Sequence, residues 1–458
     1  MTTLGGLLQI GRSSLATHQA AIGVISGNTA NADTVGFARR EVSMRSLPGA
    51  GVGIAAVMRR SSSFVEQRVL LSSARFGAHD AKAAGMSAIE AGFVESDSGI
   101  GARIDAMFAS MRTLSTNPAD LQLRTDVIAR ARSVTQAFSN GAAAIVREQA
   151  SADAAIGVEV ARVNQLTAAI ARVNEQVVGA APNTLAAAEH LDERERLLHE
   201  LAGLVEISTI PAADGSMTVL LQGGAALVQS ATAATLRATP DPALDGHRRI
   251  DLVDASGAAL DVTGNLRGGS IGGRIELRDD ILAGFADDLD ALAFELATAF
   301  NGVHSGGFGT DGVGGRNLFA PPGAVADAAA NFSVAAGMTD NPGWLAAAGD
   351  AATAVGGNDT LLALIALTDA PIAGGGTTTP GGAVASLIAE IGRTSRAEND
   401  AALAAGTQLE QNHALFQSET GVSIDEELID LVRFERAYQA GARIIQTVEK
   451  LYDAVLSL

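Results

Sequence analysis

Both ends of this chain carry apolar residues at the spacing of one helix face. Near each terminus apolar side chains recur at steps of three, four or seven positions, the spacing of a heptad stripe, which predicts an amphipathic helix. The C-terminal set has a mean step of roughly 3.5 residues, the repeat of a left-handed coiled coil. The two stripes consist of Leu4, Leu8, Leu15, Ile22 and Ile25 at the N-terminal end, and of Ile424, Leu428, Leu431, Phe434, Tyr438, Ala442, Ile445, Val448, Tyr452 and Val455 at the C-terminal end.

Such stripes need partners. Each large aliphatic side chain removed from water contributes ~1.5 to 3 kcal/mol, so an isolated surface helix would leave much of this free energy unused. We expect the first partner of each stripe to be the other end of the same chain. The next partner is another copy of the chain.

The middle of the chain changes from a helical period to a strand period and back. Helices are predicted over residues 1–31, 64–95, 104–114, 121–149, 151–178, 191–204, 273–304, 358–367, 384–416 and 424–458. Extended pieces are predicted at 41–47 and 53–57, and short strands at 205–210, 217–221, 225–228, 235–238, 249–253 and 258–262. The Gly-rich stretches 305–323 and 374–382 predict a long loop and a flexible linker.

This order predicts a mainly α fold with a β insert, of the α+β class. The N- and C-terminal segments would form a discontinuous bundle of long helices, and the strands a small all-β domain. The expected segments are 1–60 (axial helix and turn), 61–204 (first part of the bundle), 205–272 (β insert), 273–304 (bundle helix), 305–382 (Gly/Ala-rich outer segment) and 383–458 (C-terminal bundle and coiled-coil helices).

Composition narrows the possible functions. The net charge of −19 and the absence of a basic stripe argue against nucleic acid and anionic membrane surfaces as partners. The chain has no cysteine, which excludes disulfides and thiolate metal sites. No apolar run approaches about 18 residues, and no cleavable export signal is visible at the N-terminus. The histidines are scattered, so we expect neither a metal nor a cofactor.

Two short motifs invite a catalytic or ligand-binding interpretation. Residues 268–272 (GGSIG) fit G-x-S-x-G, so a secreted serine hydrolase using Ser270, with His304 and Asp279 or Asp287, is an alternative. We favour a simple turn into a helix, because His304 ends a helix in a Gly-rich segment. Residues 306–312 (GGFGTDG) contain single dinucleotide-like and calcium-repeat-like patterns, but a mobile loop explains them better.

Several polar residues receive structural interpretations. Residues 192–196 (DERER) are expected to form a solvated helix face, and residues 425–427 (DEE) to favour the positive end of a helix dipole. His18 lies on the N-terminal stripe as a packed or register-setting residue. Tyr438 and Tyr452 are expected to pack on the C-terminal stripe.

Three separated segments carry a family resemblance. Residues 28–37 (NTANADTVGF) resemble the N-x-A-N-x-x-T-x-G-[FY] signature that follows the first helix of bacterial flagellar axial proteins, the rod, hook and hook-associated subunits. Residues 421–428 (GVSIDEEL) and 433–445 resemble the closing helix of that family. Residues 268–279 and 289–304 resemble hook-associated subunits within it.

The resemblance implies a structural, non-enzymatic subunit that joins hook to filament. It implies terminal segments that are disordered in the free subunit and form a coiled coil on assembly, with Asn28, Asn31, Gly36 and Phe37 in the turn that sets the angle of the axial helix. The implied partners are other copies, the hook protein, a second junction protein and an export chaperone that holds the C-terminal helix. The implied location is extracellular, after export through the flagellar secretion apparatus.

The pattern departs from the family at a few positions. Val35 stands where Pro is common, Phe37 where Tyr is common, and residues 38–40 differ from the usual Ser-Arg-Gln. The chain is also short for the family between His304 and Ala383. A hook, rod or second junction protein is kept as an alternative, and the stretch 268–304, which such subunits are expected to lack, distinguishes it.

Overall fold

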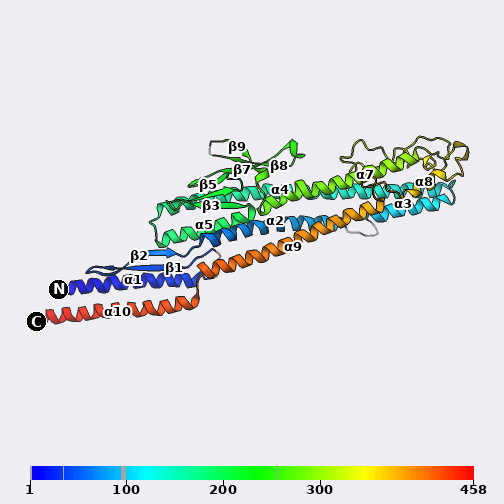
Figure 1. The fold of residues 1–458 in the computed structure, drawn as a ribbon. Coiled ribbons are helices and arrows are strands. Elements are labelled where there is room, and N and C mark those ends of the chain that lie inside the picture. The colour runs from blue at the N-terminus through cyan, green and yellow to red at the C-terminus, as the bar shows by residue number, and fades with distance from the viewer. Residues whose placement is uncertain (1–2, 33, 35, 94–98, 255, 458) are drawn as a thin grey trace. The chain divides into compact units, whose positions relative to one another are not determined.

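The computed structural model describes residues 3–32, 34, 36–93, 99–254 and 256–457, and the fold is mainly helical with a small β region (Figure 1). The helices within these residues are α1 (Leu4–Ala30), α2 (Ser63–Phe93), α3 (Ile100–Ser115), α4 (Leu121–Gly179), α5 (Leu185–Leu204), α6 (Gly269–Glu276), α7 (Leu282–His304), α8 (Asp359–Ala366), α9 (Pro380–Thr420) and α10 (Ile424–Leu456). A π-helical turn, Leu277–Ile281, joins α6 to α7.

The strands form three antiparallel groups. A hairpin follows α1, and two small sheets with strand orders β3-β4-β5-β6 and β7-β8-β9 follow α5. The strands are β1 (Arg40–Leu47), β2 (Gly51–Arg59), β3 (Ile207–Pro211), β4 (Met217–Leu221), β5 (Ala226–Gln229), β6 (Thr232–Ala233), β7 (Thr235–Pro240), β8 (Arg248–Val253) and β9 (Ala259–Asp261).

The chain divides into two compact units. The first unit comprises residues 1–78, 157–272 and 403–458, and the second comprises residues 79–156 and 273–402. Helices α2, α4, α6 and α9 each contribute residues to both units. The six segments expected from the sequence stay a prediction.

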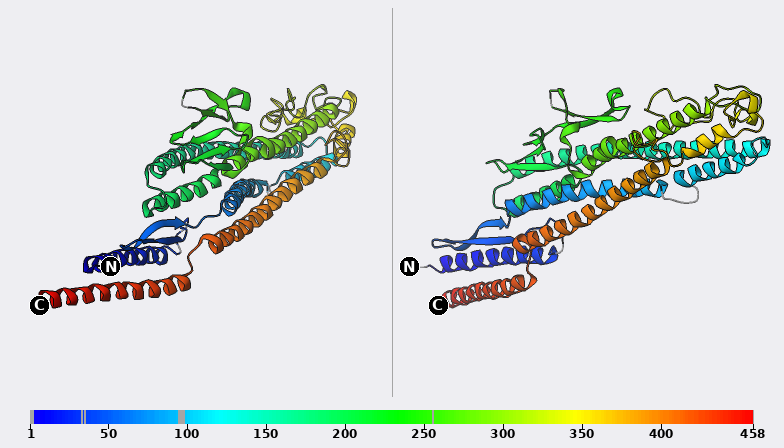
Figure 2. Two further views of the ribbon diagram at one scale, coloured as in Figure 1. Left: turned by 60° about the vertical axis from the view of Figure 1, so that its left-hand side comes forward. Right: turned by 45° about the vertical axis from the view of Figure 1, so that its right-hand side comes forward.

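In the first unit, α1 lies between the β1–β2 hairpin and α10 (Figures 1 and 2). The hairpin is anchored by hydroxyl groups of α1, because Ser13 donates to the Ala50 carbonyl at 2.6 Å and Thr17 donates to the Val52 carbonyl at 3.0 Å. Helix α10 runs antiparallel to α1 on another face. Helices α1 and α10 therefore contact each other within one chain.

The two small sheets are fixed to α4 by asparagine side chains. Asn164 exchanges hydrogen bonds with the Leu236 backbone, both at 2.8 Å. Asn174, which is fully buried, bonds to both the N–H and the carbonyl of Met217. Each asparagine side chain satisfies backbone N–H and C=O groups of a strand, as a neighbouring strand would do.

The second unit has its own apolar core, formed by α3, α7, α8 and parts of α2, α4 and α9. Phe108 and Phe300 meet in this core at a centroid distance of 5.6 Å. The π-helical turn places Arg278, which is fully buried, between Asp153 and Asp279, with hydrogen bonds of 2.6 Å to each. A buried guanidinium is tolerated here because both carboxylates neutralise it.

Several expectations need correction. The helices expected at 121–149 and 151–178 are one continuous helix, α4, because no Gly or Pro interrupts residues 149–151. The expected linker 374–382 is not free, since Glu295 accepts the N–H groups of Gly374 and Gly375 at 2.8 Å and α9 already begins at Pro380. The short strand β6 was not expected. The predicted ends at Glu95 and Leu458 lie outside the described residues.

Candidate assembly site at the terminal helices

Helices α1 and α10 approach closely where each has a glycine. A Cβ atom on Gly11 would lie 2.7 Å from a side-chain carbon of Ile445, and a Cβ on Gly441 would lie 3.0 Å from the Ser14 hydroxyl. Both glycines are buried. The small residues therefore set how near the two helices can pack.

Apolar packing continues toward the base of the helix pair, the end at which α1 finishes and α10 begins. Ala21, Ile25 and Phe434 form a buried cluster, with Leu431 partly buried against it. His18 lies over Phe434, with ring centroids 5.9 Å apart. Burial, and then the nearby Arg433, lowers the pKa of His18, so the neutral imidazole packs on the stripe as expected.

At the base, a buried hydrogen-bond network joins the two helices. Glu427, 1% exposed, accepts hydrogen bonds from Asn28 Nδ2 at 2.9 Å and from Arg39 Nε at 2.7 Å. Asn28 also exchanges hydrogen bonds with the backbone of Arg40. Arg39 further pairs with Glu426 and, at 3.7 Å, with Asp430. We call Asn28, Arg39 and Glu427 the base clamp.

The base clamp corrects the interpretation of residues 425–427. A carboxylate that only favours a helix dipole would stay in solvent, whereas Glu427 is buried with two specific donors. The N-cap residue Ser423 makes no side-chain capping hydrogen bond. Glu427 is therefore a packing and pairing residue between the terminal segments.

A second network holds the hairpin on α5. Arg59 donates to Asp192 at 2.6 Å and also pairs with Glu195, while Arg40 donates to the second Asp192 oxygen at 2.6 Å. Arg194 is 7% exposed and bonds to Asn174 and the Gly215 carbonyl. The expectation that residues 192–196 form a solvated face is wrong for Arg194 and Glu195, because partners from distant segments bury both.

Two titratable groups in this network are far from their ordinary behaviour. Burial raises the pKa of Glu195 to about 7, against the opposing effect of Arg59. Burial lowers the pKa of His199 to about 4, helped by His413. His199 and His413 stand edge to face at 5.8 Å and line a cavity of about 190 Å³ together with Phe37 and Phe416.

The turn after α1 connects these networks. Asn31 donates from its side chain to the Gly27 carbonyl at 2.9 Å and so closes the end of α1. Gly36 has φ of +82° and packs against Arg196 of α5, which explains why glycine is required there. Phe37 lies under the Arg40 guanidinium at 4.7 Å. Asp33 and Val35, which belong to the expected turn, lie outside the described residues.

The residues predicted from the stripes and the turn differ in burial. Those that are buried are Ile25, Asn28, Gly36, Phe434 and Val448. Those partly buried are Leu4, Leu8, Leu15, Ile22, Asn31, Phe37, Leu431, Ala442 and Ile445. Those exposed are Ile424, Leu428, Tyr438, Tyr452 and Val455. Their role in assembly stays a prediction.

Three residues of the hydrolase alternative, Ser270, His304 and Asp279, have other partners. Ser270 donates to Glu159 at 3.0 Å. His304 donates from Nδ1 to the Arg316 carbonyl at 2.7 Å and accepts the Ala346 N–H on Nε2 at 2.9 Å, so neither ring nitrogen can serve as a base for Ser270. Asp279 is paired with Arg278. The geometry of a nucleophile elbow is not formed by these residues.

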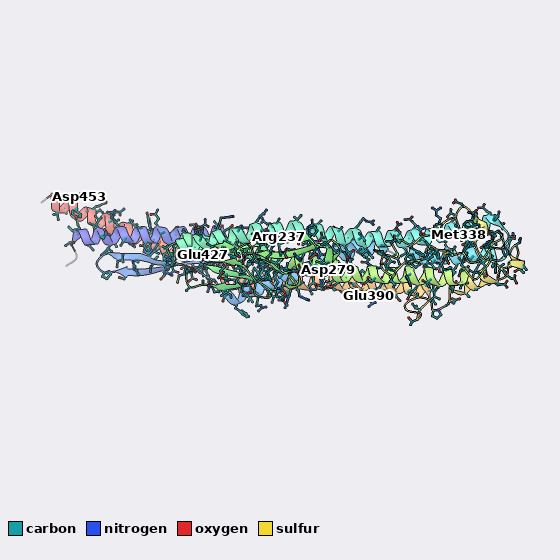
Figure 3. The ribbon with its side chains drawn as sticks, turned by 90° about the horizontal axis from the view of Figure 1, so that it is seen from above. Arg237, Asp279, Met338, Glu390, Glu427 and Asp453 are labelled. Carbon is teal, nitrogen blue, oxygen red and sulfur yellow. The ribbon has the colours of Figure 1, made fainter. Side chains whose placement is uncertain are left out.

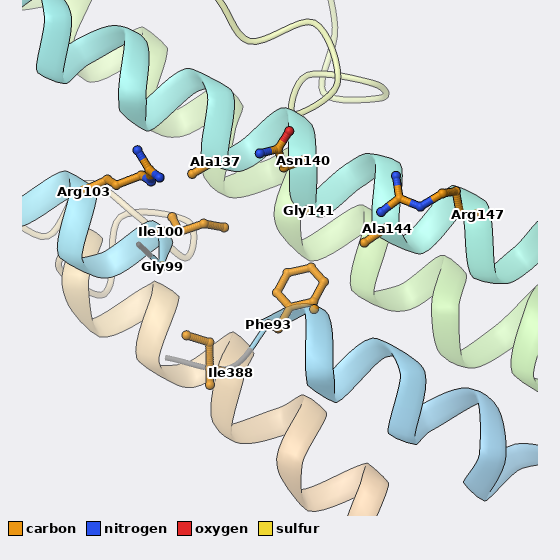
Figure 4. Close-up of a pocket in the computed structure, with 11 residues that line it drawn as sticks. Phe93, Gly99, Ile100, Arg103, Ala137, Asn140, Gly141, Ala144, Arg147 and Ile388 are labelled. Atoms are coloured by element: carbon orange, nitrogen blue, oxygen red, sulfur yellow. The ribbon is translucent and has the colours of Figure 1, made fainter. Parts of the chain in front are cut away.

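The remaining ligand interpretations find little support. In the 306–312 loop, Asp311 pairs with Arg316. Among the described residues, no group of three or more His, Asp or Glu side chains is arranged to hold a metal ion, and no helix is long and apolar enough to span a membrane. A cavity of about 410 Å³ in the second unit is lined by Phe93, Ile388, Arg103 and Arg147 among other residues (Figure 4).

Sequence reasoning missed Arg39, Arg59 and Glu195. Arg39 lies two residues after the turn signature, and two adjacent arginines at the start of a strand were an available signal. Arg59 and Glu195 are 136 positions apart, so no local pattern could pair them.

Comparison with known proteins shows that segments of the chain match profiles of flagellar axial proteins. Residues 8–37 match the profile of the flagella basal body rod protein, and residues 415–458 match that of the flagellar basal body rod FlgEFG protein C-terminal region. Residues 86–319, about half of the chain, match the helical domain of flagellar hook-associated protein FlgK. The chain therefore belongs to the family of flagellar hook-associated protein FlgK.

Full-length relatives agree with this assignment. Flagellar hook-associated protein 1 of Escherichia coli (strain K12) is 24% identical over 551 residues, covering 99% of this chain and 100% of the relative. The Bacillus subtilis (strain 168) protein of the same name is 26% identical, covering 98% and 97%. A solved structure of the flagellar hook junction protein FlgK from Burkholderia pseudomallei shares the fold, with a TM-score of 0.70, 16% identity, and coverage of 78% of this chain and 100% of that one.

Proposed function

We propose that this chain is a non-enzymatic structural subunit that joins the flagellar hook to the filament and polymerises through α1 and α10. The observation that carries the proposal is the surface of α10, which buries only one face against α1 and leaves Leu428, Tyr452 and Val455 between 41% and 59% exposed. Apolar surface of this kind marks a protein interface. Membership of the FlgK family supports the same assignment.

The partners follow from that role. Other copies of the chain would cover the free faces of α1 and α10, the hook protein would lie on one side of the resulting ring and a second junction protein on the other. An export chaperone would shield the amphipathic α10 before assembly. We infer export through the flagellar secretion apparatus to the cell exterior.

The discontinuous bundle expected from the sequence belongs to this proposal. The pairing of α1 with α10 brings the two ends of the chain into one helical layer, which would form the inner wall of the axial tube. The unfolding of these ends in the free subunit stays a prediction. Limited proteolysis tests it, because unpartnered termini would be trimmed before the centre.

An assembly experiment tests the proposal. Ile445 packs against Gly11 and is partly buried, so Ile445→Asp places a charge between the terminal helices. The variant is expressed in cells that lack their own copy. It should be absent from the hooks isolated from these cells and should not restore motility. Gln446→Asp, at an exposed neighbouring position, is the control and should assemble. Normal motility with Ile445→Asp would refute the proposal.

A further inference from the structure

Two groups of large apolar side chains remain exposed on α10, one near each end. The base patch lies in the first three turns of the helix and the tip patch in its last two turns. The base patch consists of Ile424 (50% exposed), Leu428 (50%), Ile429 (70%) and Val432 (46%). The tip patch consists of Leu451 (45%), Tyr452 (41%), Val455 (59%) and Leu456 (83%).

The helix surface between the patches is predominantly polar. Tyr438 and Ile444 are the large apolar side chains exposed there, each at 37%. The other exposed side chains of this stretch include Arg433, Glu435, Arg436, Gln439, Arg443, Gln446, Thr447, Glu449 and Lys450. At 1.5 Å per residue, Leu428 and Val455 are about 40 Å apart along the helix. Figure 3 labels Glu427 and Asp453 near the two ends.

The described part of α1 does not cover either patch. Gly11 faces Ile445 and the helices are antiparallel, so Leu4, seven residues before Gly11, falls near Tyr452. Val455 and Leu456 extend beyond that point. At the base, Asn28 of α1 bonds to Glu427. Leu428 is the next residue, so its side chain points about 100° away from that of Glu427 around the axis of α10.

We propose that the tip patch of one subunit packs on the base patch of a neighbouring subunit's α10. This inference rests on the proposed function and specifies which surfaces of two copies meet. The patches match in size and apolar character, and they lie too far apart on one straight helix to cover each other.

Symmetry favours contact between unlike patches. A base-to-base or tip-to-tip contact is isologous and closes a dimer, whereas a tip-to-base contact leaves one unused patch at each end and can be repeated by the next copy. A subunit that builds a ring or tube needs a repeating contact of the second kind.

Cysteine cross-linking tests the contact, because the chain has no cysteine of its own. Chains carrying Ile429→Cys and differently tagged chains carrying Val455→Cys are co-expressed in cells that lack their own copy. Isolated flagella are then oxidised and resolved without reductant. A disulfide needs Cβ atoms about 4 Å apart, so only residues in contact will couple. Gln439→Cys, in the polar stretch, is the control.

The expected product is a dimer of the two differently tagged chains, at least tenfold more abundant than any dimer formed by one variant alone or with Gln439→Cys. Predominant dimers of one variant with itself, or no dimer in flagella that contain both chains, would overturn the tip-to-base contact and leave the proposed function intact. If the unmodified chain itself were absent from the flagella, the proposed function and the inference resting on it would both fail.

Discussion

Replacing the buried carboxylate of the base clamp should detach α10 from α1. Glu427→Leu removes the acceptor of both Asn28 and Arg39 and leaves a guanidinium only 11% exposed with a weaker set of partners. Breaking a buried ion pair from one side costs about 3 to 5 kcal/mol. Because Glu426 and Asp430 remain near Arg39, we expect the lower end, about 3 kcal/mol.

Two milder variants separate charge from shape. Glu427→Gln keeps an acceptor for Asn28 and should cost about 1 to 2 kcal/mol. Glu426→Gln removes the other carboxylate bonded to Arg39, but its side chain is 59% exposed, so the loss should stay below about 1 kcal/mol. Burial of the carboxylate therefore predicts the order of destabilisation, which is largest for Glu427→Leu, smaller for Glu427→Gln and smallest for Glu426→Gln.

Hydrogen exchange on the chain assembled in flagella is the suitable assay, because the terminal helices are expected to be ordered there. A single unfolding free energy is not defined for a chain with two units. If the free energy of local opening falls by about 3 kcal/mol, amide exchange in α10 and the second half of α1 should become about 100-fold faster. Exchange in the second unit should stay unchanged. Equal exchange in Glu427→Leu and Glu426→Gln would refute the reasoning that the buried carboxylate holds the terminal helices together.

Further predictions concern close packing, pH and the serine motif. Gly11→Ala should destabilise the helix pair relative to Gly23→Ala by about 1 to 3 kcal/mol, because a Cβ meets Ile445 at Gly11 and nothing within 4 Å at Gly23. Amide exchange of α1 in assembled flagella measures the difference. Burial lowers the pKa of His304 to about 4, so the stability that its neutral form gives above pH 6.5 should be lost as pH falls toward 4, by up to about 3 kcal/mol. Trp344, the sole tryptophan, lies two residues before Ala346, whose N–H donates to His304. The fluorescence of Trp344 should therefore change over that pH range, and constant emission would contradict the prediction. Ser270→Ala should leave assembly unchanged; esterase activity in the purified chain that disappears in this variant would instead restore the hydrolase alternative.

The long periodic features of this fold could be predicted from the sequence. The terminal stripes repeat over many turns, so the existence of α1 and α10 could be predicted from their period. Short strands bounded by Gly, Asp and Pro were likewise found near their true positions. These signals are local, and each is carried by residues close in the chain.

The buried charges could not be predicted in the same way. A charged residue is buried only when partners from elsewhere satisfy it. Glu427 meets Arg39 from 388 positions away, and Glu195 meets Arg59 from 136 positions away. Taken alone, each acidic run is typical of a solvated helix end or face. The corrections at residues 192–196 and 425–427 therefore fall where long-range ion pairs form.

The two adjacent arginines explain how the terminal helices are held relative to α5 within the first unit. Successive residues of an extended segment point to opposite sides, so Arg39 reaches α10 while Arg40 reaches Asp192 of α5. The Arg40 backbone also bonds to Asn28 at the end of α1. One dipeptide thus contacts three helices that are far apart in sequence. We infer that the orientation of α1 and α10 depends on this dipeptide as well as on the turn before it, because the turn closes α1 but the arginines supply the charged contacts to both neighbouring helices.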